Sequence, residues 1–234
     1  MIWVFDLDDT LYPEITFVES GFKEVAQWLD NEFGLNKNEA FKQMLQLLEE
    51  KGRGEIFNDV LKKHNLFSKQ LLKKCIQKYR LHYPEIKLYP EAKSCLERLR
   101  NFPLYVVTDG HKIVQSNKVK ALQLNKYVKH VYITYRYGIK RSKPSPYCFE
   151  LIAKKENAPF DEIAYVADNP NKDFIGIKPY GLKTIRVLQG YYKDLKMDNE
   201  HEADVNIRSL DELTPKCLHQ HFQDSNINRI SNYG

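Results

Sequence analysis

The feature that most restricts how this chain can fold lies near its start, where a short apolar run ends at a group of carboxylates. Residues 2–5, Ile-Trp-Val-Phe, have the composition of a buried strand, and Asp6, Asp8 and Asp9 follow within four positions. Side chains alternate along an extended segment, so Asp6 and Asp8 are expected on one side and Asp9 on the other. Carboxylates that face one cleft repel each other unless a cation or hydrogen-bond donors compensate their charge. The sequence therefore predicts a metal site at the end of this strand, with an acidic surface turn as the alternative.

Length and composition indicate an ordinary soluble protein. The 234 residues, 42% of them hydrophobic, suffice for one large domain or for a core with a smaller companion. The apolar run before Asp6 is too short for a signal peptide, and no stretch reaches the roughly 20 apolar residues of a membrane span, so we expect a cytoplasmic protein. The four cysteines include no Cys-x-x-Cys pair, which argues against a zinc site or a disulfide framework. They are Cys75, Cys95, Cys148 and Cys217.

The net charge of +5 is modest, and the distribution of lysines does not suggest a nucleic-acid interface. Lysines between residues 62 and 78 flank the apolar stripe of a predicted helix, and we interpret them as its solvent-exposed face. A nucleic-acid interface requires a denser basic patch with interleaved aromatic residues. We therefore expect neither nucleic acid nor a membrane as a partner and make no prediction about oligomeric state. A mild positive charge suits a small anionic ligand.

Residues 14–87 have helical periodicity and no convincing strand pattern. Phe22, Val25 and Leu29 recur at spacings of three and four residues, which is typical of an amphipathic helix. Similar spacings predict three more helices before residue 82, and Ser68 is placed to cap the last of them. The sequence thus predicts a small helical bundle inserted between the first strand and the rest of a sheet.

Three Tyr-Pro-Glu segments border this bundle, at residues 12–14, 83–85 and 89–91. We interpret them as hinges of a mobile cap, and stiff connections within a rigid body are the alternative. The predicted domains are an α/β core of residues 1–13 and 88–218, a helical cap of residues 14–87, and a polar C-terminal tail of residues 219–234.

From residue 100 onward, short apolar segments alternate with helical ones, which predicts a parallel sheet covered on both faces. The predicted strands are residues 104–108, 131–134, 163–167, 183–187 and 204–207, and the predicted helices are residues 112–122, residues 145–156 and one that starts near Ser209. The fold class is therefore α/β, a Rossmann-like parallel-sheet core with an inserted helical cap. Such sheets bind ligands at the carboxyl ends of their strands.

Polar residues follow several of the predicted strands at that edge. Asp6, Thr108 and Asp168 each stand at the end of a strand, so they can converge in one cleft. Thr108-Asp109-Gly110 offers an anion a hydroxyl and an approachable backbone amide, although this triplet alone is more often a simple turn.

Two further segments carry charges toward the same edge. Lys143 precedes Pro144, which keeps the lysine extended so that it can reach the cleft, and a surface lysine is the alternative. Asp168 and Asp173 lie five residues apart in a proline-containing turn, where an Asx turn and a helix cap are the alternative. Together, Asp6, Asp8 and Asp168 with Lys143 beside them suit a single hard cation such as Mg²⁺.

In this order the segments resemble the four motifs of the haloacid dehalogenase-like hydrolases. They are Asp6-Leu7-Asp8-Asp9-Thr10 after the first strand, Thr108-Asp109-Gly110, Lys143-Pro144-Ser145-Pro146-Tyr147-Cys148-Phe149, and Asp168 with Asp173, where Ala167 replaces the usual glycine. Gln115-x-x-Lys118 and the segment 134–138 are similar to the phosphatase branch with helical C1 caps.

This resemblance implies a Mg²⁺-dependent phosphatase that acts on a small phosphorylated metabolite, a sugar phosphate or a nucleoside monophosphate, through an aspartyl-phosphate. It assigns Asp6 as nucleophile, Asp8 as general acid and base, and Lys143 as the compensating cation. The residues that it assigns to phosphate binding are Thr108, Asp109, Gly110 and Lys143. Those that it assigns to the metal are Asp6, Asp8 by its backbone carbonyl, Asp168 and Asp173. A phosphomutase on the same motifs and a non-catalytic binding protein are the alternatives.

Two details depart from the family pattern. Arg136 stands where an acidic residue is common, and the segment before Lys143 is longer by about two residues, including Lys140 and Arg141. That basic segment either contacts an anionic substrate or forms a solvated turn. In the predicted cap, the candidates for substrate specificity are the residues just after Tyr12 and the Gly52-Arg53-Gly54 turn, with Arg53 as the first residue to test.

Overall fold

The computed structural model describes residues 1–214 of the chain and contains one sheet of six parallel strands. The strands are β1 (Ile2–Phe5), β2 (Leu104–Thr108), β3 (His130–Ile133), β4 (Ile163–Ala167), β5 (Lys183–Val187) and β6 (Val205–Ile207), in the order β3-β2-β1-β4-β5-β6. The first strand thus lies near the centre, paired with β2 on one side and with β4 on the other. This is the predicted α/β fold class.

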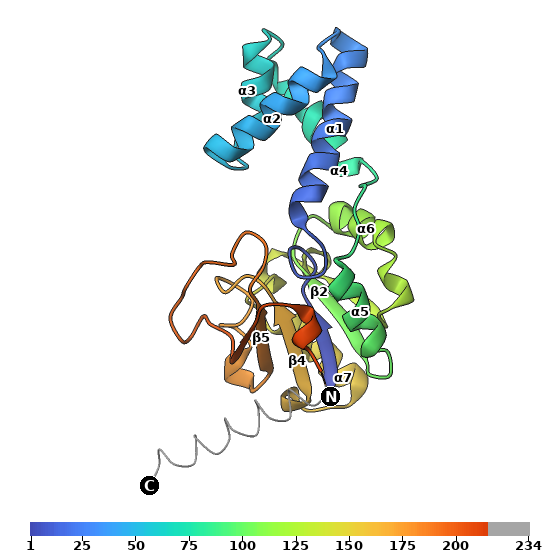
Figure 1. Cartoon of the computed structure of the whole chain (residues 1–234), viewed down its shortest axis with the longest axis vertical. Coiled ribbons are helices and arrows are strands. Elements are labelled where there is room, and N and C mark those ends of the chain that lie inside the picture. Colours follow the sequence, from blue (N-terminus) through green and yellow to red (C-terminus); the bar gives the residue numbers. More distant parts are fainter. Residues whose placement is uncertain (215–234) are drawn as a thin grey trace.

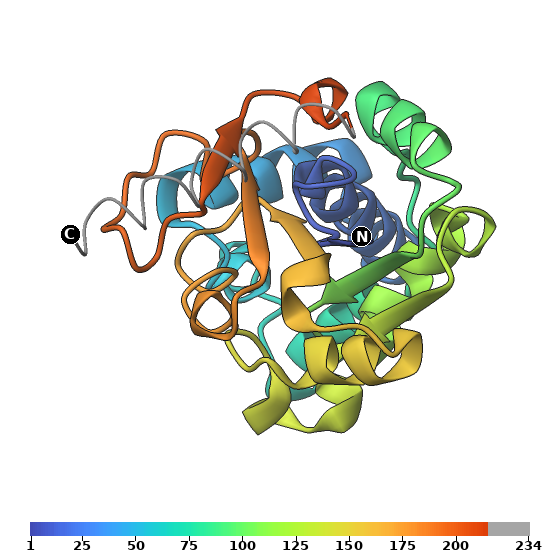
Figure 2. The same cartoon turned by 90° about the horizontal axis from the view of Figure 1, so that it is seen from below.

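Helices cover both faces of the sheet, as Figure 2 shows in a view along the strands. Alternate strand residues such as Trp3 and Phe5 pack against α5 (Pro90–Arg98) and α6 (Lys112–Ala121). Their neighbours Ile2 and Val4 pack on the opposite face against α7 (Tyr147–Glu156). Because both faces of β1 are buried, its four residues are all apolar.

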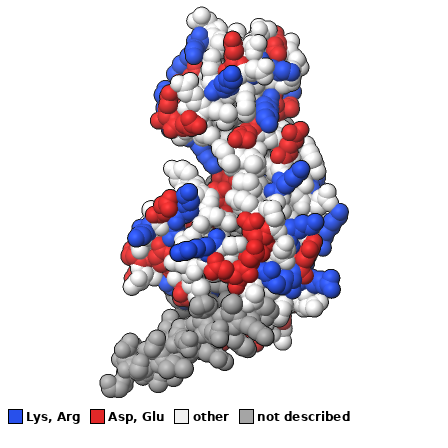
Figure 3. Space-filling model, viewed as in Figure 1, with Lys and Arg blue, Asp and Glu red and all other residues white. Residues whose placement is uncertain are grey.

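Four helices follow β1 and form a bundle apart from the sheet (Figure 1). They are α1 (Glu14–Phe33), α2 (Lys37–Lys51), α3 (Ile56–Lys63) and α4 (Lys69–Leu81). They enclose a separate apolar core that includes Phe22, Val25 and Met44. The predicted cap, residues 14–87, contains all four helices. Figure 3 shows a narrow waist between this bundle and the sheet-containing part, with acidic and basic side chains interleaved on the visible face of both.

Local signals explain several boundaries. Ser68 caps α4 as predicted, because its Oγ accepts the backbone N–H of Leu71 at 3.1 Å. The strand predicted for residues 131–134 begins instead at His130 and ends at Ile133. The helix predicted near Ser209 is wrong as an extended helix, since only a 3-10 turn, Leu210–Glu212, forms among the described residues. The Pro215 that follows disfavours a helical conformation at the residue before it.

Short 3-10 helices complete the connections. They are η1 (Leu124–Lys126), η2 (Thr134–Tyr137), η3 (Ile139–Arg141), η4 (Phe160–Glu162), η5 (Lys178–Tyr180) and η6 (Leu210–Glu212). Cys75, Cys95 and Cys148 are buried and free, whereas Cys217 and the predicted tail, residues 219–234, lie outside the described residues. Within residues 1–214, no helix combines the length and the apolar character needed to cross a membrane.

Candidate active site

The order of the strands brings the predicted site residues to one edge of the sheet. Asp6 follows β1, Thr108 ends β2 and Asp168 follows β4, and these three strands are neighbours. The backbone N–H of Asp6 still donates to Val166 at 2.8 Å, so the sheet itself positions this residue. The chain then turns, with Asp9 in the left-handed region at φ 53°.

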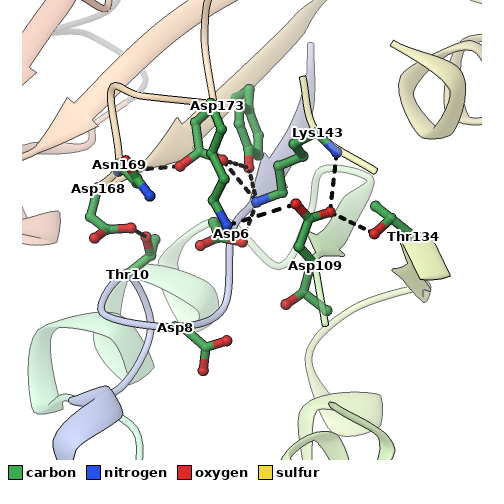
Figure 4. Close-up of polar contacts among 12 residues, drawn as sticks. Asp6, Asp8, Thr10, Asp109, Thr134, Lys143, Asp168, Asn169 and Asp173 are labelled. Atoms are coloured by element: carbon green, nitrogen blue, oxygen red, sulfur yellow. Dashed lines mark hydrogen bonds and ion pairs between the residues drawn. The ribbon is translucent and has the colours of Figure 1, made fainter. Parts of the chain in front are cut away.

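Three buried carboxylates meet at this edge (Figure 4). Asp6, Asp168 and Asp173 each place a carboxylate oxygen within 4.8 Å of the other two. Burial raises the pKa of Asp6 to about 7 against the opposing charge of Lys143. Burial and the neighbouring Asp6 and Asp173 raise the pKa of Asp168 well above its ordinary value. A buried excess of negative charge, offered by oxygen ligands, fits a hard divalent cation.

Lys143 is the cation that the chain itself supplies to this cluster. Its Nζ donates to Asp6 at 2.5 Å and to Asp173 at 2.8 Å, and it lies 2.8 Å from the Tyr165 hydroxyl. Its side chain is only 2% exposed. Burial opposes its charge, but Asp173 and Asp6 outweigh that effect and raise the pKa of Lys143 well above its ordinary value. Lys143 is therefore a buried partner of the predicted nucleophile, and its surroundings favour its charged form.

The carboxylate of Asp8 lies apart from this cluster (Figure 4). It accepts hydrogen bonds from Lys118 at 2.6 Å, from the Tyr12 hydroxyl at 2.5 Å and from Gln115 at 2.9 Å. Burial favours its neutral form, but these donors, led by the charge of Lys118, lower the pKa of Asp8. Asp8 and Asp6 line one pocket. The side chain of Asp8, however, is hydrogen-bonded to Lys118 and Gln115 of helix α6 and not to the acid cluster.

The residues predicted to bind phosphate are linked to both of these groups through Gln115 and Lys143. Thr108 Oγ1 accepts a hydrogen bond from Gln115 at 2.6 Å. Asp109 accepts one from the Thr134 hydroxyl at 2.5 Å and one from the backbone N–H of Lys143 at 3.2 Å, so it holds the loop that carries Lys143. Gly110 has a φ of +133°, which favours glycine because it has no side chain.

A pocket of about 190 Å³ opens over these side chains. From the core it is lined by Asp6, Asp8, Asp9, Thr108, Asp109, Asp168, Asn169, Lys172 and Tyr192, and from the helical bundle by Glu14 and Arg53. Arg53, the predicted specificity residue, therefore does reach the pocket. A larger hollow of about 490 Å³ lies on the surface of the bundle, between α1 and α4 and against Trp28 and His82, and none of the predicted site residues lines it.

Several pocket residues were not predicted from the sequence. Lys172 lies 3.7 Å from Asp109, and its position between Asp168 and Asp173 was the only available signal. Tyr192 belongs to the long loop after β5, which carries no motif. Its loop is held by the buried Arg186, which donates to the carbonyl of Tyr192 at 2.6 Å and to that of Asp168 at 3.3 Å.

Comparison with known proteins decides the family. Residues 2–181 match the family model described as haloacid dehalogenase-like hydrolase. The chain belongs to this family. The hydrolase is 30% identical over 219 residues to glyceraldehyde 3-phosphate phosphatase of Methanocaldococcus jannaschii, covering 90% of this chain and 93% of that protein. It is 26% identical over 230 residues to the Pyrococcus furiosus protein of that name, covering 95% of each chain.

Solved structures show the same fold. The hydrolase superposes on an HAD phosphatase from Thermococcus onnurineus with a TM-score of 0.56 and 26% identity, covering 90% of this chain and 94% of that one. It superposes on a 2-haloacid dehalogenase from Pseudomonas syringae with a TM-score of 0.64 and 22% identity, covering 94% and 99% of the two chains. The latter likeness concerns the fold alone.

Proposed function

We propose that this hydrolase releases phosphate from a small sugar phosphate, with Mg²⁺ bound at the acid cluster and through an aspartyl-phosphate. The family and the phosphatase names of its relatives identify the chain as a phosphoric monoester hydrolase. Four curated relatives are named for glyceraldehyde 3-phosphate, which favours a sugar phosphate over a nucleoside monophosphate. The observation that carries the proposal is the buried Asp6, which contacts Lys143 and lies within reach of two further carboxylates.

Magnesium is the proposed metal because the cluster offers three carboxylates, two of which, Asp6 and Asp168, line a pocket that can also hold water and a phosphate oxygen. Asp6, Asp168 and Asp173 and the backbone carbonyl of Asp8 are its proposed ligands. When bound, the ion would neutralise charge that develops on the phosphoryl oxygens. One solved structure of this fold, a putative HAD-hydrolase from Bacillus subtilis at 19% identity, is described as bound to magnesium.

In the first proposed step, an Asp6 oxygen attacks phosphorus and the bond from phosphorus to the ester oxygen breaks. Asp8 donates its proton to the departing oxygen. The donors around Asp8 favour its ionised form, so the protonated form depends on the nearby phosphate, whose negative charge raises the pKa of a carboxyl. Lys143, Thr108 and the Gly110 amide are proposed to stabilise the equatorial oxygens, and Asp109 to hold their loop.

In the second proposed step, water attacks the phosphoryl group on Asp6 while Asp8 accepts a proton from that water. The bond between Asp6 and phosphorus then breaks, which regenerates the carboxylate and releases inorganic phosphate. The ionised form of Asp8 that Lys118 and Tyr12 favour is the form that this step requires.

We also propose that residues 14–87 act as a cap over the pocket, with residues 1–13 and 88–214 as the described part of the catalytic core. The contribution of Glu14 and Arg53 to the pocket lining supports this role. As a cap, the helical bundle would exclude water from the first step and select the substrate by contact with its organic part.

A phosphate-release assay tests the proposal. The full chain is incubated with glyceraldehyde 3-phosphate, other sugar phosphates and nucleoside monophosphates, with Mg²⁺ or with a chelator. We expect release that depends on Mg²⁺ and falls at least about 10³-fold in Asp6→Asn. Release unchanged in that variant would contradict the proposal, and conversion to an isomeric phosphate without release would indicate a phosphomutase.

A further inference from the structure

The geometry points to Glu14 as a residue that selects phosphate esters whose organic part carries no second negative charge. This inference rests on the proposed phosphatase function and specifies its substrate class. Glu14 begins helix α1 and lines the pocket that also contains Asp6 and Asp8. Its side chain is 20% exposed, so it faces the pocket and keeps partial contact with solvent.

The backbone of Glu14 is held at this position from the core. Its N–H donates to Asp9 Oδ1 at 2.8 Å, while Asp9 Oδ2 accepts the N–H of Tyr191 at 3.1 Å. One carboxylate thus connects the first turn of the cap to the loop after β5. Because Asp9 directly follows Asp8 in sequence, the position of Glu14 is coupled to the turn that carries the predicted acid and base.

Glu14 forms an ion pair with Arg53, the cation that the helical bundle contributes to the pocket. Arg53 reaches back from the turn between α2 and α3, and its two terminal nitrogens donate to the two oxygens of Glu14 at 2.9 and 2.6 Å. This bidentate pair occupies the edge of the guanidinium formed by its two terminal nitrogens, which is then not free for a substrate carboxylate. Arg53 is therefore compensated before any substrate arrives.

The other cations near this part of the pocket are also paired. Lys118 contacts Asp8 at 2.6 Å and lies 3.9 Å from Glu14, and Lys172 lies 3.7 Å from Asp109. Among the described residues that line the pocket, six carry carboxylates and two carry positive charges. The six are Asp6, Asp8, Asp9, Glu14, Asp109 and Asp168, and the two are Arg53 and Lys172.

These charges disfavour a second anion on the substrate. Such an anion would either stay near Glu14 and be repelled by it, or displace Glu14 from Arg53 and leave the Glu14 carboxylate without its bidentate partner in an acidic pocket. An uncharged hydroxyl or carbonyl group meets neither penalty, because it can form hydrogen bonds with the existing pair. The pair of Glu14 and Arg53 thus discriminates by charge at the end of the pocket that faces the cap.

A matched pair of substrates tests this inference. Glyceraldehyde 3-phosphate and 3-phosphoglycerate share one carbon skeleton and differ in whether the terminal group is an aldehyde or a carboxylate. We expect the wild-type chain with Mg²⁺ to have a kcat/KM for the aldehyde at least about tenfold higher. Glu14→Gln keeps the size of the side chain and frees Arg53 from its ionic partner, so the ratio should shift toward the carboxylate by about tenfold or more.

Two further variants separate charge selection from a structural effect. Arg53→Met removes the bidentate partner of Glu14 and leaves it only Lys118 at 3.9 Å, so the ratio should move the other way, toward the aldehyde. The Arg53 side chain is 59% exposed, and we therefore expect the fold to tolerate the change. In Glu14→Gln/Arg53→Met, the shift of the kcat/KM ratio toward 3-phosphoglycerate that Glu14→Gln causes should disappear. Asp59→Asn removes another ion pair of the cap, with Lys51 at 2.7 Å, and should leave the ratio unchanged.

The outcomes distinguish this inference from the proposed function. If both substrates are hydrolysed and neither single variant changes their ratio, or if the wild type prefers the carboxylate, the inference is overturned and the phosphatase function stands. If the folded wild type with Mg²⁺ hydrolyses neither these two compounds nor any other phosphate ester, both are overturned.

Discussion

Lys118 donates to Asp8 across 2.6 Å, from helix α6 to the turn that follows β1. The Lys118 side chain is 4% exposed and that of Asp8 is 22% exposed, so this is a largely buried ion pair. The ammonium also lies 4.4 Å from the centre of the Phe17 ring in the helical bundle. One lysine thus contacts the predicted acid and base of the core and the first helix of the cap.

We predict that Lys118→Met lowers the free energy of unfolding by about 3 kcal/mol, because it leaves the Asp8 carboxylate buried without its cation. In Asp8→Asn/Lys118→Met the loss should be smaller than the sum of the two single losses, since no uncompensated charge remains. Urea unfolding measures both. Lys129→Met is the control: its partner Glu156 lies at 2.9 Å, but Lys129 is 51% exposed and the loss should stay below about 1 kcal/mol. Equal losses in the two lysine variants would contradict the prediction.

Gly176 allows the loop of the third motif to pack against that of the fourth. A Cβ at this position would lie 1.7 Å from the carbonyl oxygen of Pro144, which directly follows Lys143. We predict that Gly176→Ala destabilises the protein by about 3 kcal/mol and lowers activity, because the loops must separate. Gly54→Ala is the matched control, since no atom lies within 4 Å of its added Cβ, and thermal unfolding should change by little. A Gly176→Ala protein as stable as the control would be inconsistent with this packing.

Protonation of His82 should make the stability of the protein depend on pH. Burial lowers the pKa of His82 below its ordinary 6.5, its Nδ1 contacts the carbonyl of Tyr79 at 2.6 Å, and its Nε2 has no hydrogen-bond partner among the described residues. The charged groups Glu24 and Lys118 also act on it. The His82 imidazole therefore binds a proton more readily in the unfolded chain than in the folded one. Stability is lost as pH falls below about 6.5.

The free energy of unfolding should fall between pH 7 and pH 5 in the wild type. We predict that it falls less steeply in His82→Phe, and that below pH 6.5 the two slopes differ by up to about 1.4 kcal/mol per pH unit. Chemical unfolding at a series of pH values measures the slope in both proteins. Other titrating groups, such as His130, are common to both and cancel in the difference. Identical slopes would show that His82 is not held neutral.

The acid cluster predicts that Mg²⁺ stabilises the protein independently of any substrate. A ligand that binds only the folded state adds about 2.7 kcal/mol at 100 times its dissociation constant. We expect the midpoint of thermal unfolding to rise with Mg²⁺ in the wild type and in Arg53→Met, and to stay constant in Asp168→Asn/Asp173→Asn, which lacks two of the three carboxylates. A wild-type midpoint that does not respond to Mg²⁺ would argue against metal binding at this cluster.

Much of the fold follows from local sequence signals. All six strands were predicted within a residue or two. The signal is strongest for β1, β2 and β4, which are buried on both faces and consist almost entirely of apolar residues. The convergence of Asp6, Thr108 and Asp168 also followed, since the carboxyl ends of parallel strands share an edge. Of the helix expected near Ser209, the described residues form only the 3-10 turn Leu210–Glu212, since Pro215 disfavours a helical conformation at the residue before it.

The remaining site residues depend on contacts that a linear pattern does not encode. Glu14 and Arg53 are 39 positions apart and pair only because the cap folds back on its own first turn. Tyr192 reaches the pocket because the buried Arg186 holds its loop through backbone carbonyls, which any sequence can provide. Arg53 was predicted as a specificity residue, but its pairing with Glu14 and the place of Tyr192 in the pocket become visible only when the tertiary structure brings these segments together.

The central claim is that Asp6 receives the phosphoryl group. The most direct test is to mix the full chain with glyceraldehyde 3-phosphate and Mg²⁺, quench the reaction in acid within milliseconds, and locate any phosphoryl group by mass spectrometry of the N-terminal peptide. We predict a phosphoryl group on Asp6 that disappears as free phosphate forms and is absent in Asp6→Asn. Phosphate release by the wild type without a phosphorylated Asp6 in the quenched samples, or with phosphate on another residue, would contradict the account.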